Sequence, residues 1–456
     1  MKRFEFLRWS AGGLFAALAL VVTAPSMARA EPVQKWSWED LVAAVERTHP
    51  LMDAARAGLD QLEAKLGQAD WSIFPSFKLD AGGTITPKIT GDALTSESDW
   101  GTIGVYGQLQ LDMVQPLWTF GKISALKAAA TAGVQAGKAA VDIARWELRT
   151  RVAEAFYGRL LARELDAILV EGKGWIDKAE KRMEKLRDSD SPDYDQLEHL
   201  RLKTRVADFY TLQAQNQLLL TQASQGLRLL LSKPAGDEVE LAPDGLEPIA
   251  CELAEPERYA RIARENDPVV RAAAGNARAQ DYLADAKAAE LWPDVVLVGK
   301  VDLRTATVIE DQDSFFARDP YHTKSVGAAI GLRWKLDVPQ RLFQADEARA
   351  KAARAQAELE VAEDLGEFKV LQLVRELMNK KELIEVMRQA QKAAQGWLTA
   401  TWDTYDAGFG NFRDVMDALV QFYQKKLGYL QLVFEHNILI WKLSQAVGGD
   451  VCNLAH

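Results

Sequence analysis

Four short segments of the chain alternate apolar and polar residues with the two-residue period of a β-strand. In the second of them, Leu109 and Leu111 alternate with Gln108 and Gln110. Each predicted strand therefore has one apolar and one polar face. The four predicted strands are 76–86, 101–114, 295–305 and 325–336.

A composition typical of helices follows the second and the fourth predicted strand. Proline is absent from Leu117 to Ser191, where residues that favour helices dominate. About 70 helical residues with a rise of 1.5 Å each span roughly 100 Å, far more than the few turns of an ordinary helix. Such a helix needs partners along its length. We expect Pro116 to end the strand before it, and we predict helices at 118–188, 193–232, 340–404 and 412–447.

The chain also carries an internal repeat. Pro50 recurs as Pro268 at an offset of 218 residues, and Asp195 recurs as Asp414 at an offset one residue longer. Each copy contains a moderate helix, two strands joined by a polar loop, a long helix, a short break and another helix. This shared order indicates a duplication. The predicted repeats are 31–245 and 246–456, with moderate helices at 38–72 and 257–291.

Strand pairs with one apolar face suit two architectures. One is a small sandwich packed on a core, and the other is the wall of a membrane barrel with a wet interior. Charged residues such as Lys78, Asp80, Lys300 and Asp302 on the polar face favour the second. Four strands cannot close a barrel alone and would leave open edges. We therefore expect several copies of the chain to close one barrel jointly.

The N-terminus has the pattern of a secretory signal peptide. Lys2, Arg3 and Arg8 precede a short apolar run at 11–24, and a small-residue cleavage site ends at Ala30. We predict cleavage after Ala30, because the run is too short for the alternative, an uncleaved membrane anchor.

The exported chain is acidic. The full sequence has 55 basic and 65 acidic residues. Residues 1–30 contain four of the former and one of the latter, which leaves 51 − 64 = −13. This charge argues against nucleic-acid binding, which needs basic surfaces to neutralise phosphates. No later segment reaches the ~18 apolar residues of a membrane-spanning helix, so only strands can bring this chain into a membrane.

Catalytic chemistry is hard to find in the sequence. There is no Gly-rich phosphate loop and no nucleophile elbow, and the histidines are scattered without metal-ligand spacing. We expect no enzyme activity, no cofactor and no metal site. Cys251 and Cys452 suit either a disulfide in an oxidising compartment or two free thiols. The histidines are His49, His199, His322, His436 and His456.

Over nearly all of its exported part the chain resembles the TolC-type outer-membrane efflux proteins, the outer membrane factors. The resemblance is carried by the order of elements, by helix starts at Pro50 and Pro268, by the Gln115-Pro116-Leu117 junction, and by the second helical tip from Tyr405 to Ala418. It implies a mixed, mostly α fold, in which a homotrimer forms a long α-helical coiled-coil barrel. Four strands from each protomer then form a 12-stranded outer-membrane β-barrel.

The same resemblance implies a function and partners. The protein would be a passive conduit across the periplasm and outer membrane, part of a tripartite efflux or type I secretion system. Its partners would be outer-membrane lipid, a periplasmic adaptor and an inner-membrane pump of the RND or ABC type. The exported substrate, whether drug, metal ion or protein, is left open.

The resemblance also assigns roles at the tips. Asp414 and Asp417, one helical turn apart, match a pair that rings the channel entrance and would favour cations. The alternative for them is two solvated surface acids. Tyr405 matches a residue of the lock that holds the entrance shut, with Asp195 as its acidic partner and Arg413 as a substitute for the arginine that Gly410 replaces.

Further positions follow from the resemblance. The adaptor-contact tip would be Gly408, Phe409 and Gly410, whereas the first tip lacks a glycine turn. The linker between the repeats and the C-terminus would share one belt around the helices, which brings Cys251 near Cys452. The competing interpretation is a periplasmic adaptor-like or structural coiled-coil protein without a membrane barrel, which would be monomeric or soluble.

Overall fold

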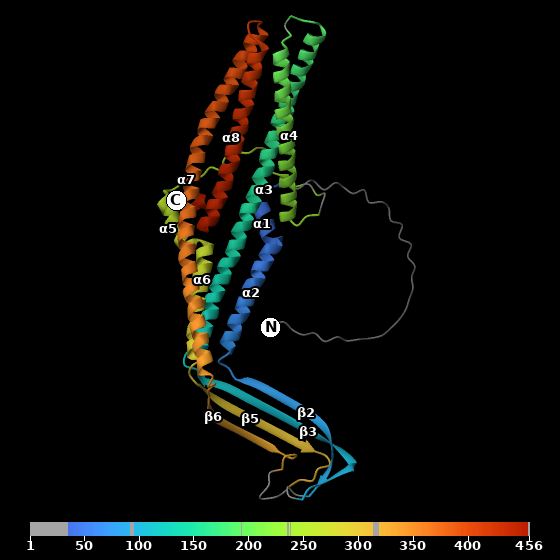
Figure 1. Cartoon of the computed structure of the whole chain (residues 1–456), viewed down its shortest axis with the longest axis vertical. Coiled ribbons are helices and arrows are strands. Elements are labelled where there is room, and N and C mark those ends of the chain that lie inside the picture. The colour runs from blue at the N-terminus through green and yellow to red at the C-terminus, as the bar shows by residue number, and fades with distance from the viewer. Residues whose placement is uncertain are drawn as a thin grey trace, which may run out of the picture.

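A four-stranded sheet lies at one end of an elongated molecule, and two helical hairpin tips lie at the other end (Figure 1). The computed structural model describes residues 35–91, 95–192, 194–234, 237, 239–312 and 319–454. The predicted signal peptide and its cleavage site after Ala30 lie outside the described residues.

The elements of the two halves follow one another in the same order. The first half contains α1 (Trp38–Thr48), α2 (Pro50–Trp71), β2 (Ser76–Thr90), β3 (Glu97–Trp118), α3 (Lys122–Asp188) and α4 (Gln196–Leu230). The second half contains α5 (Pro256–Asn266), α6 (Pro268–Ala289), β5 (Asp294–Ala306), β6 (Lys324–Arg333), α7 (Val338–Asp406) and α8 (Phe412–Val447). Three short elements are β1 (Lys35–Trp36), β4 (Glu240–Leu241) and α9 (Val451–Leu454).

The expectation that Pro116 ends the second strand was wrong. Strand β3 continues to Trp118, with a register shift against β5 between Pro116 and Trp118. Proline has no N–H to donate to the ladder, so a bulge at this point lets pairing continue beyond it. As a result, α3 begins at Lys122 instead of residue 118.

Each predicted moderate helix is two helices in the structure. The backbone is extended at His49, whose Nδ1 accepts a hydrogen bond of 3.1 Å from the N–H of Leu51 and caps α2. In the second half, Asp267 caps α6 by accepting from Val269 at 2.8 Å. Proline follows each cap at the first helical position, where its missing N–H has no helical acceptor to lose.

The sheet has the order β2-β3-β5-β6, and all its neighbours are antiparallel. Its register aligns apolar with apolar side chains across all four strands. One row is Leu79, Leu111, Val301 and Val326, and the next row, on the opposite face, is Asp80, Gln110, Asp302 and Ser325. The apolar face is bare within one chain, because Leu79 is 62% and Val326 81% exposed.

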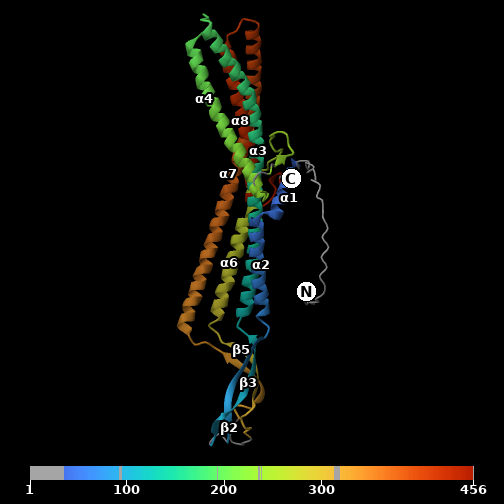
Figure 2. The same ribbon diagram turned by 90° about the vertical axis from the view of Figure 1, so that its right-hand side faces the viewer.

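The long helices pack in pairs along the molecule. Helix α3 lies against α2 and α6 below and against α4 and α8 above, and α7 runs beside α6 and then α8 (Figure 2). Where α6 crosses α3, Gly275 is required, since a Cβ there would lie 2.8 Å from the backbone nitrogen of Ala136. Buried side chains concentrate near the middle of the molecule, around Phe156 of α3 and Leu443 of α8.

The segment between the two halves and the C-terminus are fastened to α8. The Asn437 side chain accepts from the Ile249 N–H at 2.9 Å and donates to the Glu247 carbonyl at 2.8 Å. Nearby, Cys251 and Cys452 form a disulfide with their Cα atoms 5.0 Å apart. None of the described helices combines the length and the apolar character needed to cross a bilayer.

Candidate functional site

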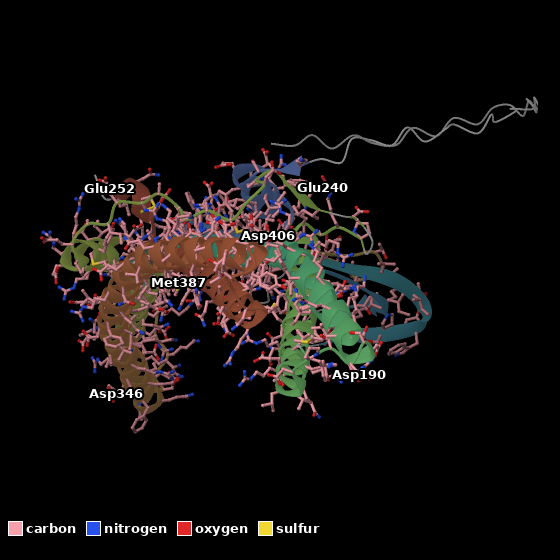
Figure 3. All side chains as sticks on the ribbon, turned by 90° about the horizontal axis from the view of Figure 1, so that it is seen from above. Asp190, Glu240, Glu252, Asp346, Met387 and Asp406 are labelled. Carbon is pink, nitrogen blue, oxygen red and sulfur yellow. A yellow bond between two sulfur atoms is a disulfide. The ribbon has the colours of Figure 1, made fainter. Side chains whose placement is uncertain are left out.

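The two hairpin tips, where α3 turns into α4 and α7 into α8, face each other at one end of the molecule. Viewed from above, Asp190 and Asp406 mark these tips (Figure 3). The second tip turns at Gly408, whose φ of 82° is a conformation that glycine adopts without strain. Asp195 caps α4 through the N–H of Leu197, and the side chain of Asn411 caps α8. These caps fix where the helical side chains of the site begin.

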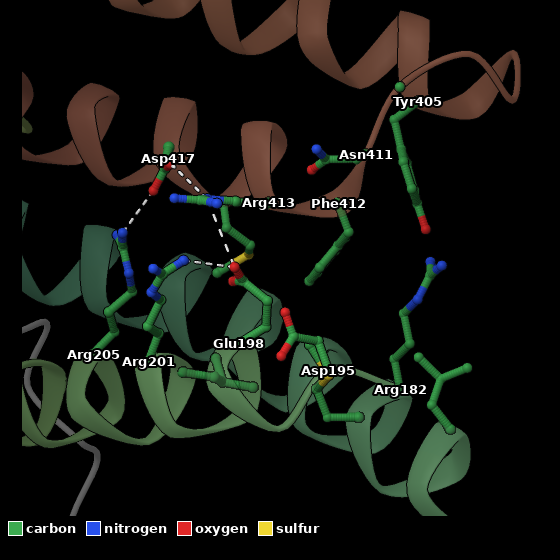
Figure 4. Close-up of a pocket in the computed structure, with 15 residues that line it drawn as sticks. Arg182, Asp195, Glu198, Arg201, Arg205, Tyr405, Asn411, Phe412, Arg413 and Asp417 are labelled. Carbon is green, nitrogen blue, oxygen red and sulfur yellow. Dashed lines mark hydrogen bonds and ion pairs between the residues drawn. The ribbon is translucent and has the colours of Figure 1, made fainter. Parts of the chain in front are cut away.

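A cavity of about 690 Å³ lies between the tips. Its walls come from the end of α3, the start of α4 and the start of α8, together with the α7–α8 turn (Figure 4). The lining holds four arginines against three acids, so the space between the hairpins is rich in charge of both signs. The charged lining residues are Arg182, Arg201, Arg205, Arg413, Asp195, Glu198 and Asp417.

Ion pairs across this cavity join α4 to α8. Arg205 of α4 contacts Asp417 of α8 at 2.6 Å, and Arg413 of α8 reaches Glu198 of α4 at 3.7 Å (Figure 4). Arg201 also contacts Glu198, at 2.7 Å, and Arg413 lies 4.0 Å from Asp417. Every pair is partly exposed, so each contributes only about 0.2–1 kcal/mol, and their stabilising effect lies in acting together.

An aromatic cluster holds α3 against the second tip. The guanidinium carbon of Arg182 lies 5.1 Å from the ring centre of Tyr405 and 5.3 Å from that of Phe412. This geometry is that of a cation–π contact, which holds the end of α3 against the second tip. Trp402 extends the cluster, with its ring 6.2 Å from that of Tyr405 and 4.9 Å from that of Trp175.

The structure separates the two aspartates that the sequence treats as a pair. Asp414 is exposed, and the contact recorded for it is its backbone N–H to Asn411. Asp417 is half-buried and paired with Arg205. Of these two aspartates, Asp414 is the one without an ion pair among the described residues.

The other expected tip residues have different neighbours. Among the described residues no hydrogen bond joins Tyr405 to Asp195: the first packs on Arg182, and the second caps α4. Arg413 does take part in contacts between the hairpins. Phe409, between Gly408 and Gly410, is 88% exposed at the far end. Cys251 and Cys452 are bonded to each other and pack against the core cluster of α5, α7 and α8, away from the tips.

Sequence reasoning named Arg413 but missed the other three arginines of this site. Arg201 and Arg205 are one helical turn apart on α4 and so share a face, which was a usable signal. The sequence around Arg182 does not indicate a role for it, because an arginine near a helix end is usually solvated. Which acids these arginines meet depends on how far α4 is shifted along α8.

The chain was compared with protein families, curated sequences and solved structures. Residues 41–231 match the family model described as outer membrane efflux protein. No curated protein sequence matches the chain. The structure is similar to the outer-membrane channel OprN (20% identity, TM-score 0.73, 90% of each chain covered). It is also similar to open MtrE of Neisseria gonorrhoeae (17%, TM-score 0.72, 92% of this chain and 90% of that one). A third match is VceC of Vibrio cholerae (19%, TM-score 0.69, 91% and 96%).

The fold is thus that of TolC-like outer-membrane channels. The family model matches only the first half of the chain, and the similar structures include channels of the outer membrane. The family and the similar structures are channels rather than enzymes.

Proposed function

We propose that this chain forms the outer-membrane duct of a tripartite efflux or type I secretion system and acts as a passive conduit. The observation that carries the proposal is the sheet. Among the described strands β2 and β6 are its edges, each paired with one strand only apart from a single bridge from Ile89 to Ile309, and its exposed apolar face runs across all four strands. Such a sheet suits lipid on one side and water on the other.

Three copies supply what one copy lacks. If β6 of one protomer pairs with β2 of the next, twelve strands close a barrel and leave no edge. The helices also leave surface for neighbouring copies to cover, because large apolar side chains stay exposed along α7. These are Phe343, Val361, Leu365 and Phe368, which neighbouring protomers would cover.

The tips are the proposed gate of this duct. The contacts of Arg205 with Asp417 and of Arg182 with Tyr405 hold the two hairpins together, which narrows the entrance when three copies surround it. Asp414 from each copy would form a ring of exposed carboxylates that attracts cations. The exposed Phe409 offers a periplasmic adaptor a hydrophobic contact, and the inner-membrane pump would supply the energy and choose the substrate.

Conductance tests this function. Protein exported with its signal peptide removed after Ala30 is purified from the outer membrane and added to planar bilayers. We expect small, cation-selective steps that increase when the tip contacts are broken. A protein that never conducts, even with Arg205→Ala and Arg182→Ala combined, would contradict the proposal and favour the adaptor-like alternative.

A further inference from the structure

One end of β5 and β6 faces away from the helices (Figure 1). Three metal-ligating side chains, those of Asp311, Asp319 and His322, lie close together next to it. The Nδ1 atom of His322 lies 2.9 Å from Asp311 Oδ1 and 3.1 Å from Asp319 Oδ2. One ligand atom from each of the three residues lies within 4.8 Å of the others. The three positions share no spacing that a sequence motif describes, and the loop between the strands brings them together.

A contact at Nε2, the ring nitrogen remote from the two carboxylates, orients the imidazole of His322. Its Nε2 lies 3.0 Å from the carbonyl oxygen of Ala306, which accepts hydrogen bonds and cannot donate them. Nε2 must therefore carry the hydrogen, and in the neutral ring Nδ1 presents its lone pair to the two carboxylates. Three electron-rich atoms at these distances repel one another unless a cation lies between them. A backbone carbonyl that orients the remote nitrogen is also the usual support of a metal-binding histidine.

Backbone hydrogen bonds fix the position of the Asp319 carboxylate. Its Oδ1 accepts from the N–H groups of Tyr321 at 2.7 Å and His322 at 3.1 Å, and its Oδ2 accepts from Gln312 at 3.0 Å. Its side chain is only 10% exposed, whereas that of Asp311 is 79% exposed. A cation can thus enter from the Asp311 side and meet two ligands whose positions are already fixed.

We propose that Asp311, Asp319 and His322 bind a divalent transition-metal cation, for which Zn²⁺ is the best match. Imidazole nitrogen and carboxylate oxygen are both zinc ligands, and a site with three protein ligands leaves the fourth tetrahedral position to water. The nitrogen ligand disfavours Mg²⁺ and Ca²⁺, which prefer oxygen. The bound ion would tie the two ends of the β5–β6 loop together. The proposal does not depend on the conduit function, because the three ligands belong to one chain.

Isothermal titration of the purified, metal-stripped full chain in detergent tests this site. At about pH 8 we expect one Zn²⁺ per chain and no saturable binding of Mg²⁺. His322→Ala should abolish the zinc binding, and Asp311→Asn should weaken it at least tenfold. Asp311→Asn is informative because this exposed side chain accepts none of the backbone hydrogen bonds that shape the loop at Asp319.

The matched control is His199→Ala. His199 contacts the hydroxyl of Tyr194 at 3.1 Å in the first tip, far from the sheet, so this variant should bind zinc as the wild type does. Absence of saturable zinc binding by the wild type would overturn the proposal, because the histidine would then hold only a proton between the acids. Equal zinc binding by wild type and His322→Ala would overturn it as well.

Discussion

Two aspartates one helical turn apart on α8 should have different effects when neutralised. Asp417→Asn removes the partner of Arg205 across the two hairpins, at a contact of 2.6 Å. The two side chains are 36% and 41% exposed, so solvent screens the pair and its contribution is about 1 kcal/mol. In the proposed trimer three such pairs open together, which gives about 3 kcal/mol, or roughly a 150-fold shift toward the open gate.

Asp414→Asn is the matched control. It changes the same charge on the same helix, but Asp414 is exposed and has no ion pair among the described residues. We expect this variant to leave the open probability near that of the wild type and to reduce cation selectivity. Neutralising both aspartates should combine the two effects.

Single-channel recording in planar bilayers measures both quantities. The double variant Arg205→Asp with Asp417→Arg restores opposite charges at the same positions and should return the open probability toward that of the wild type. If Asp417→Asn and Asp414→Asn open equally often, the Arg205–Asp417 pair does not hold the tips together and the proposed gate is refuted.

Three further predictions concern stability and assembly. Replacing both cysteines by serine opens a loop that spans 201 residues and should lower the unfolding free energy by up to about 5 kcal/mol relative to the oxidised wild type, measured by denaturant titration, whereas the reduced wild type should resemble the variant. Burial lowers the pKa of His436 below its usual 6.5, so the unfolded chain takes up this proton first. The unfolding free energy should therefore fall as the pH drops below 6.5. Denaturant titrations at several pH values should show a smaller fall for His436→Gln than for the wild type. Val326→Lys places a charge on the apolar face of β6, at a cost of about 2–4 kcal/mol in lipid. It should reduce the protein recovered from the outer membrane, whereas Ser325→Lys on the polar face should not.

The sequence predicts local features of this fold well. The alternation of apolar and polar residues around Leu109 and Leu111 identifies a strand and its apolar face, because a period of two depends only on neighbouring residues. The absence of proline after Leu117 indicates the long helix for the same reason. Composition alone does not show the break at His49, because one extended residue leaves the surrounding helical composition unchanged, and the helix start at Pro50 came from the resemblance.

Long-range features depend on information that the sequence does not display. The pairing of Arg205 with Asp417 requires the axial position of α4 against α8, over 212 residues of separation. The convergence of Asp311, Asp319 and His322 depends on how a loop folds back between two strands. Pro116 shows a different limit, since a bulge let the strand pass a residue that normally ends one.

The stoichiometry of the protein in its native membrane tests the proposed duct most directly. Outer membranes are extracted with mild detergent, and the mass of the purified particle is measured by light scattering with the detergent contribution subtracted. We predict three polypeptides per particle, all recovered from the membrane fraction. A single polypeptide recovered from the soluble periplasmic fraction would contradict a shared barrel built from three open-edged sheets.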